Sequence, residues 1–152
     1  MAIQFRRAHE NDAGHVLSMI YHFYEEFDYE YDENIMRDAM MRLLLDENIG
    51  EMYLIEKEQQ QIGYAVLTFG FSLEYGGRDA FIDEIFLKPP NRGQGIGREA
   101  VRFLLERARV LNIRALHLEV ENENRRALKM YEDQGFKSNK RSLLTHRIAN
   151  QP

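Results

Sequence analysis

The chain has 152 residues, of which 44% are hydrophobic and 30% are charged, and its formal net charge is −5. This length suits one domain built around one core, and the composition excludes a disordered, collagen-like or coiled-coil chain. The absence of cysteine excludes a disulfide scaffold, thiol catalysis and thiolate metal sites, and the excess of acids disfavours a nucleic-acid partner.

The first half of the chain predicts a strand, two amphipathic helices and an antiparallel hairpin. Apolar residues recur at helical spacing in two segments, which Asn11 or Asp12 and then Asp32 would cap. Gly76 and Gly77 tolerate the positive φ of a tight turn, so the strands around them should pair antiparallel. The expected segments are a strand at 3–6, helices at about 11–27 and 32–49, and strands at 52–56, 62–74 and 79–87. On the second helix, the residues expected to face the core are Ile35, Ala39, Met40, Leu43 and Leu44.

The second half predicts a strand, helix and strand in succession. Pro89 and Pro90 end one strand, residues 95–111 form the clearest helix, and residues 115–120 alternate as the next strand. Because this order requires a right-handed crossover, the two strands should pair in parallel. The remaining expectations are a left-handed residue at Asn112, a helix at 125–134 closed by Gly135, and final strands from Phe136 in which Leu143, Leu144 and Ile148 alternate.

These elements predict an α+β fold of three layers, with a mixed, mostly antiparallel sheet, a central parallel strand pair and flanking helices. No linker or repeat interrupts the chain, so we expect one domain over residues 1–152. The amino terminus lacks the apolar segment of an export signal, and no run is long enough to span a membrane. We therefore expect a cytoplasmic protein with no membrane partner.

A glycine-rich turn separates the strand that ends before Pro89 from the clearest helix. It reads Arg92-Gly93-Gln94-Gly95-Ile96-Gly97. Its glycines allow a ligand to approach the main chain, and the unpaired N–H groups of a helix start attract anions. The turn is therefore predicted to hold a phosphate group.

Three kinds of nucleotide site compete for this turn. A P-loop would need Gly-Lys-Ser/Thr, whereas Arg98 and Glu99 follow Gly97 here. A dinucleotide-binding unit fits Gly95-x-Gly97-x-x-Ala100 locally, with Glu119 near the expected acidic position, but the chain is too short for the other parallel units that fold needs. The third candidate is the pyrophosphate of an acyl-coenzyme A.

Two motifs support the third candidate. Arg92-x-x-Gly95-x-Gly97 lies at the strand-to-helix turn, and Asn124-x-x-Ala127-x-x-x-Tyr131-x-x-x-Gly135-Phe136 follows the next strand. Together they resemble the GNAT superfamily of acetyl-CoA-dependent N-acyltransferases, and the order of elements matches that superfamily over nearly the whole chain. The resemblance implies an N-acetyltransferase that moves an acetyl group from acetyl-CoA to a primary amine by direct attack in a ternary complex.

The resemblance also implies which residues bind the cofactor. In the superfamily, main-chain N–H groups of the glycine turn hold the pyrophosphate, and a neighbouring strand pairs with the pantetheine arm, which lies where two parallel strands splay apart. The residues carried over are Ile85, Phe86, Leu87, Arg92, Gly93, Gln94, Gly95, Ile96, Gly97, Arg98 and Asn124. Backbone N–H near Leu87 is expected to hold the oxyanion.

A general acid and a general base complete the implied chemistry. Tyr131 matches a tyrosine that often protonates the leaving thiolate, and a phenol with a pKa near about 10 carries the proton needed. The amine must be neutral before it attacks, so a carboxylate should remove its proton. Glu84 and Glu119 are equal candidates for this base, with Asp83 behind them. Asp83 and Glu84 are adjacent in a strand, so both can enter one cleft only if a bulge intervenes.

An acidic segment dominates the charge of the chain. Residues 25–33 contain six acids and no base, and without them the net charge would be +1. Such runs are usually solvated surface. In the superfamily, however, this stretch lines the acceptor cleft, so Glu26, Asp28 and Glu30, with aromatic residues between them, are candidates to bind a cationic acceptor of polyamine or lysyl type.

The alternative function is a non-catalytic acyl-CoA-binding or regulatory module on the same fold, because fold alone does not establish catalysis. A covalent acyl-enzyme is not expected, since cysteine is absent and no Ser-His pair has a recognisable context. His117 beside Glu119 is best interpreted as structural, and the other histidines lack ligand spacing, so no metal is expected. The expected partner is a small-molecule or peptide amine, and many superfamily members are homodimers.

Overall fold

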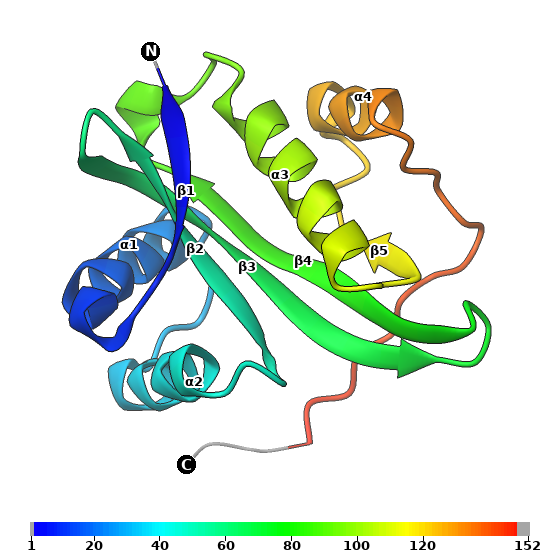
Figure 1. Ribbon diagram of the computed structural model, residues 1–152, viewed down its shortest axis with the longest axis horizontal. Helices are drawn as coiled ribbons and strands as arrows, with labels where there is room; N and C mark the ends of the chain where they lie inside the picture. Colours follow the sequence, from blue (N-terminus) through cyan, green and yellow to red (C-terminus); the bar gives the residue numbers. More distant parts are fainter. Residues whose placement is uncertain (1, 149–152) are drawn as a thin grey trace. The chain divides into compact units, whose positions relative to one another are not determined.

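The computed structural model describes residues 2–148 in two compact units, one ending at Glu119 and the other beginning at Val120. Figure 1 shows the elements in chain order. In the first unit these are β1 (Ile3–Arg7), η1 (Glu10–Asp12), α1 (Ala13–Glu26), α2 (Glu33–Leu45), β2 (Gly50–Lys57), β3 (Gln60–Ser72), β4 (Gly77–Leu87), η2 (Pro89–Asn91), α3 (Ile96–Val110) and β5 (Ala115–His117). In the second unit the helix is α4 (Arg125–Asp133).

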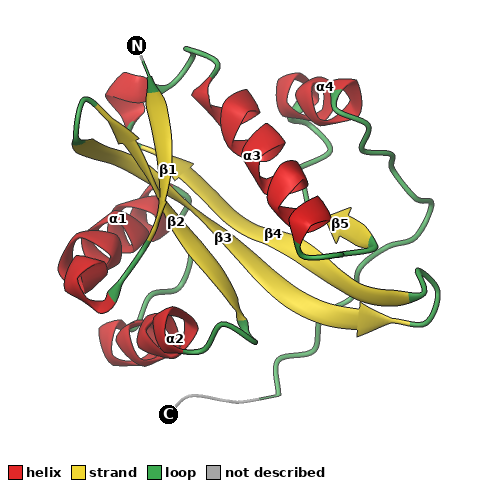
Figure 2. Cartoon of the chain, viewed as in Figure 1, coloured by secondary structure: helices red, strands yellow, loops and turns green. Residues whose placement is uncertain are grey.

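The five strands form one mixed sheet in the order β1-β2-β3-β4-β5 (Figure 2). Neighbouring strands from β1 to β4 pair antiparallel, and the long β3–β4 hairpin turns through the expected glycines. β4 and β5 pair in parallel, with α3 as the crossover between them. The predicted mixed sheet with one parallel pair is therefore confirmed. The pair lies at the edge of the sheet rather than at its centre, because within residues 2–148 no strand pairs with the outer side of β5.

The two faces of the sheet are covered by different helices, because successive strand residues point to opposite sides. On one face, Leu54 and Tyr64 pack with residues of α1 and α2 in a common core. On the other face, Ile55 packs with Ile96 and Ala100 of α3. The glycine turn thus joins two packed elements, β4 of the sheet and α3 on its second face, which hold the turn at both ends.

A buried ion cluster anchors α3 to the sheet. Glu51 of β2 is only 3% exposed and accepts hydrogen bonds from Arg107 of α3 at 2.8 and 2.7 Å. Arg7 of β1 and the hydroxyl of Tyr53 contact the same carboxylate at 3.2 and 2.6 Å. Because buried charges are stable only when paired, this cluster favours one position of α3 along the sheet.

The predicted cap is observed at the start of α2 but not at the start of α1. Asp32 caps α2, accepting a hydrogen bond from the main-chain N–H of Ile35 at 3.1 Å, as predicted. Asp12 precedes α1 but does not cap it. Its carboxylate instead accepts a hydrogen bond from the main-chain N–H of His9 at 2.8 Å and binds the guanidinium of Arg6 at 3.1 and 2.9 Å. A bidentate, charge-assisted pair is stronger than a single cap bond, so it determines the orientation of Asp12. Ile35 was expected in the core but is 45% exposed.

The carboxyl-terminal expectations are wrong in two places. β5 ends at His117 rather than Val120, and within residues 136–148 no strand forms. Leu143 and Leu144 are 67% and 90% exposed, so their alternation does not mark a buried face. Alternation is a property of one segment, whereas a strand also needs a second strand to pair with its main-chain groups.

Asn112 and Gly135 do adopt the expected positive φ, at 60° and 99°. In the part of the chain described, no helix is long and apolar enough to cross a membrane.

Candidate active site

The parallel pairing of β4 with β5 is short and ends in an opening. Three residue pairs join the strands, and the last of these is Phe81 with His117. Beyond it, β4 continues to Leu87 with β3 on one side. The opposite edge of β4 is therefore not paired with β5 from Ile82 onward, which leaves main-chain groups that an extended ligand can use.

A β-bulge lies beside this opening. Leu67 of β3 pairs with Ile82, and the adjacent Val66 pairs with Glu84, so Asp83 is an extra residue in β4. A bulge increases local twist and redirects side chains. It also removes the strict alternation that would have placed Asp83 and Glu84 on opposite faces. Both carboxylates therefore remain candidates for one cleft.

Two tyrosines hold the side chain of Glu84. The hydroxyl of Tyr24, on α1, donates a hydrogen bond to Glu84 Oε2. The hydroxyl of Tyr64, on β3, donates to Glu84 Oε1 at 2.7 Å. Both oxygens are thus oriented by donors from different elements, which fixes the carboxylate between the sheet and α1.

Opposing effects act on the protonation of Glu84. Burial has the largest effect and raises the pKa of its carboxyl group, and the Asp83 carboxylate raises this pKa further. The hydrogen bonds from Tyr24 and Tyr64 lower it. The net result is a raised pKa. Burial and the Glu84 charge raise the pKa of both phenols, so they act as hydrogen-bond donors. A half-buried carboxylate with a raised pKa is a recognised feature of acid–base sites.

Asp83 and Glu119 form the other part of this acidic group. Surrounding protein atoms, and then the charge of Glu119, raise the pKa of Asp83. The residue is nevertheless exposed at the protein surface, where water screens its carboxylate and moderates both effects. Glu119 is also exposed and lies beyond the end of β5. The three candidate bases thus share one neighbourhood, in which only Glu84 is held by neutral donors.

The glycine turn has the backbone geometry that close contact with a ligand needs. Gly93 and Gly95 have φ of 76° and 82°, in the left-handed region that favours glycine. A Cβ added at Gly93, Gly95 or Gly97 would meet no atom within 4 Å. No side chain caps α3, whose first N–H groups lack helical partners. Gln94 is tied back to the carbonyl of Pro90 at 3.2 Å, and Ile96 is buried on the α3 face.

Arg92 is engaged by the acidic segment. Its two terminal nitrogens donate to the carboxylate of Glu26 at 2.6 and 2.7 Å, and its Nε donates to the carbonyl of Leu87 at 2.8 Å. The guanidinium also lies 5.7 Å from the ring centre of Phe86, which is buried against α1. Arg92 lowers the pKa of Glu26, which is therefore paired rather than available to a second cation. Ile85 and Leu87 are partly buried on either side of Phe86.

The rest of the acidic segment joins α1 to α2. Asp28 and Glu30 are exposed, and Asp28 has a left-handed φ of 55°. Next to them in the chain, the rings of Phe27 and Tyr29 stack with their centres 6.1 Å apart, and both rings contact Phe23 edge-on. Phe27 and Tyr29 are each half exposed. Acidic and aromatic groups are thus presented together, an arrangement that attracts cations.

The second unit carries the other two predicted residues. Asn124 begins α4, and its Oδ1 accepts a hydrogen bond from the main-chain N–H of Ala127 at 3.1 Å. Tyr131 follows about two helical turns later and contacts Phe136 edge-on at 5.9 Å. The cap uses the amide oxygen of Asn124, so its amide NH₂ group can still donate hydrogen bonds.

Sequence reasoning missed the two tyrosines that hold Glu84. Tyr24 was assigned only to a helix face, and Tyr64 only to a strand. They lie 60 and 20 residues from Glu84 along the chain. One local signal existed, because a tyrosine at a buried strand position needs a partner for its hydroxyl. Among residues 2–148, no cluster of three or more histidines or carboxylates is arranged to hold a metal ion.

Comparison with known proteins gives a consistent result. The model of the acetyltransferase (GNAT) family matches residues 16–136. Thialysine N-epsilon-acetyltransferase of Bos taurus is 28% identical over 142 residues, covering 88% of this chain and 83% of that protein. Aminoalkylphosphonate N-acetyltransferase of Salmonella typhimurium is 27% identical over 134 residues, covering 88% and 84%.

A solved structure is similar over almost the full length. An integron cassette protein from the mobile metagenome of Cole Harbour Salt Marsh superposes with a TM-score of 0.86 and 32% identity. The match covers 97% of this chain and 92% of that one. The fold is therefore shared with a known structure over nearly all of the chain.

Proposed function

The chain belongs to the acetyltransferase (GNAT) family and is an acetyl-CoA-dependent N-acetyltransferase, and we propose that it acetylates a small primary amine by direct attack in a ternary complex. The observation that carries this proposal is the edge of β4 beyond its last pair with β5. This edge includes Glu84, and β4 leads directly into the turn before the uncapped start of α3. The names of the relatives support an amine acceptor, since each of the two describes an N-acetyltransferase of an amine-bearing molecule.

The residues of the glycine turn fit the cofactor. Main-chain N–H groups from Gly93 to Arg98 would hold its pyrophosphate, because Gly93, Gly95 and Gly97 leave the space above the helix start open. The unpaired edge of β4 at Ile85–Leu87 would bind the pantetheine arm by main-chain hydrogen bonds, with Asn124 contacting the arm by its amide NH₂. Acetyl-CoA supplies the activated acetyl group.

We assign the general base to Glu84. Tyr24 and Tyr64 orient its carboxylate, and their hydrogen bonds favour its ionised form against the effect of burial. Glu84 removes a proton from the acceptor ammonium, directly or through water, and the neutral nitrogen attacks the acetyl carbon. The N–H of Leu87 stabilises the developing oxyanion. Tyr131 then donates its phenolic proton to the leaving sulfur. Glu119 and Asp83 are the alternative bases.

The direct test is release of free thiol from acetyl-CoA across a panel of alkylamines, diamines, amino acids and peptides. We expect thiol release with at least one small amine and none without an acceptor. Binding of acetyl-CoA without turnover on any amine would favour the alternative, a non-catalytic acyl-CoA-binding module. Failure to bind coenzyme A at all would reject both functions.

We further propose that Asp28 and Glu30 attract a cationic acceptor of polyamine or lysyl type, with Phe27 and Tyr29 stacking on it. Reversing both charges, by Asp28→Lys and Glu30→Lys, should raise the KM of a cationic acceptor about 5- to 30-fold, since each exposed charge contributes about 0.5–1 kcal/mol. The KM of acetyl-CoA should change less than twofold. Steady-state kinetics with a diamine measures both constants.

Two comparisons control this experiment. The pair Glu47→Lys and Glu58→Lys changes the net charge equally, at exposed positions outside the segment, and should leave the acceptor KM unchanged. Glu26→Lys is kept separate, because Glu26 binds Arg92 and its reversal should raise the KM of both substrates. If the two double variants raise the acceptor KM equally, the segment has no specific role.

A further inference from the structure

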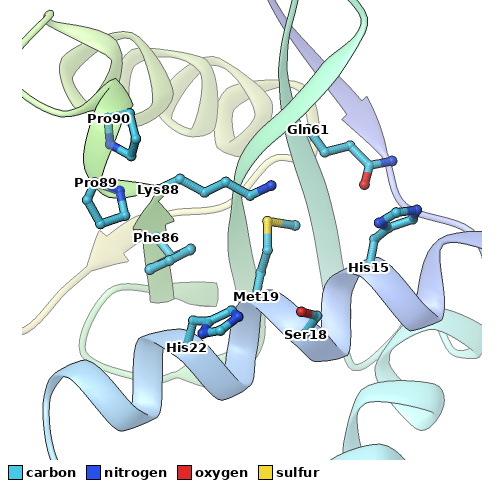
Figure 3. Close-up of a pocket in the computed structure, with 9 residues that line it drawn as sticks. All are labelled: His15, Ser18, Met19, His22, Gln61, Phe86, Lys88, Pro89 and Pro90. Atoms are coloured by element: carbon cyan, nitrogen blue, oxygen red, sulfur yellow. The ribbon is translucent and has the colours of Figure 1, made fainter.

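A pocket on the α1 side of the sheet is not used by the proposed reaction. It has a volume of about 380 Å³ and lies between α1, the start of β3 and the end of β4. Figure 3 shows Lys88 extending across it above Met19, with the two histidines on the same side of α1. The lining residues are His15, Ser18, Met19, His22, Gln61, Phe86, Lys88, Pro89 and Pro90.

The chemistry of this lining is opposite to that of the whole chain. Acids outnumber bases in the protein, with 25 against 20, yet the lining contains one lysine, two histidines and no carboxylate. His15, Ser18 and His22 share one face of α1 because they are spaced by helical turns. Gln61 adds an amide from β3. Every polar side chain in the pocket can therefore donate a hydrogen bond, and the titratable groups that face it are His15, His22 and Lys88.

The main chain that carries Lys88 is held in place, and most donor side chains of the pocket belong to exposed residues. The main-chain N–H of Lys88 binds the carbonyl of Ile62 at 2.8 Å, and two prolines follow, so the base of the side chain is rigid. Within residues 2–148, the side chains of His15, Ser18, Gln61 and Lys88 make no hydrogen bond or ion pair with the protein. Met19 and Phe86 are each 3% exposed and add apolar surface.

We infer that this pocket binds a small organic anion, a carboxylate, phosphate or phosphonate attached to an apolar group. Lys88 would supply the charge, the histidines and Gln61 the further donors, and Met19 and Phe86 the contact for the apolar part. Pockets that combine apolar surface with convergent polar groups are typical of small-molecule sites. The pocket borders the glycine turn, where Gln94 binds the carbonyl of Pro90 at 3.2 Å, but the proposed acetyl transfer uses none of the pocket's donor side chains.

The test uses phenylphosphonate as the probe, titrated calorimetrically into protein saturated with coenzyme A so that the glycine turn is already filled. We expect Lys88→Gln to weaken probe binding about tenfold or more, since a hydrogen bond to a charged group contributes about 1.5–3 kcal/mol. Arg37→Gln on α2 removes an equal charge outside the pocket and should leave probe affinity unchanged. Thermal unfolding checks that each variant folds.

A double variant adds a second readout. His15→Ala with His22→Ala removes two further donor side chains, so it should also weaken phenylphosphonate binding. Absence of probe binding, or equal weakening by Lys88→Gln and Arg37→Gln, would overturn the inference. If coenzyme A itself fails to bind, the same titration without it still tests the pocket, so the two proposals fail separately.

Two amine acceptors that differ in charge, ε-aminocaproate and hexylamine, distinguish whether the anion is part of the acceptor or a separate ligand. If Lys88→Gln raises the KM for ε-aminocaproate alone, the pocket takes the anionic end of the acceptor. If it weakens the phenylphosphonate complex and changes the KM for neither amine, the anion is a separate ligand. Either result supports an anion site.

Discussion

Replacing Gly97 with aspartate should weaken the binding of acetyl-CoA at least about 100-fold while leaving the fold intact, a loss of about 2.7 kcal/mol in binding free energy. Gly97 occupies the second position of α3, and a Cβ there would meet no atom within 4 Å. An acid in the first turn favours the helix. The same carboxylate would occupy the space that the phosphate needs. It would also repel the phosphate charge, at a cost of about 4 kcal/mol for unit charges 4 Å apart near a protein surface.

The matched control is Gly14→Asp. Gly14 is the second residue of α1 and has equally open surroundings, so the substitution makes the same local change at another helix start. Calorimetry with coenzyme A and thermal unfolding are measured for both variants. We expect similar melting temperatures and a loss of binding for Gly97→Asp alone. Similar affinities in the two variants would show that the start of α3 does not hold the pyrophosphate.

The second large effect is expected from Glu84→Gln, which keeps the shape of the side chain but removes the base. We expect kcat to fall about 10²- to 10⁴-fold, the usual contribution of a general base, with little change in the KM of acetyl-CoA. Glu56→Gln provides the comparison, since Glu56 is a largely buried carboxylate that pairs with Arg6 on the opposite part of the sheet. It should retain wild-type kcat.

The pH profile separates a base from a structural carboxylate. Hydrogen bonds from Tyr24 and Tyr64 lower the pKa of Glu84, so Tyr24→Phe should raise it. Because the base acts only when ionised, activity is lost as the pH falls through this pKa, and the acidic limb should move to higher pH in the variant. Asp83→Asn and Glu119→Gln are measured in parallel. A wild-type rate for Glu84→Gln, with a large loss for Glu119→Gln, would move the assignment to Glu119.

The regular elements could be predicted because their causes are local. The apolar stripe of α3, the left-handed Asn112 and the Asp32 cap each depend on residues within a few positions of one another. The glycine turn was predictable for the same reason, since positive φ and a helix start are both properties of adjacent residues. Its place after a strand then limited the kinds of ligand it could bind.

The remaining features depend on partners that are distant in the chain. Glu26 and Arg92 are 66 residues apart, and the tyrosines that hold Glu84 come from two other elements. The bulge at Asp83 has no glycine or proline to mark it, so composition did not indicate it. The prediction of a strand at residues 143–148 was wrong for the opposite reason: the alternating pattern is local, but no strand of the described residues pairs with this segment.

The surplus residue in β4 has a geometrical consequence for the whole sheet. A strand that has one residue more than its neighbour over the same length bends at that point and twists more strongly. Asp83 is two residues past the last contact with β5, so the curvature begins where the two strands separate. The bend therefore depends on the number of residues in β4 rather than on the size of the Asp83 side chain. We expect a substitution of Asp83 to keep the bulge beside the opening and a deletion of Asp83 to remove it.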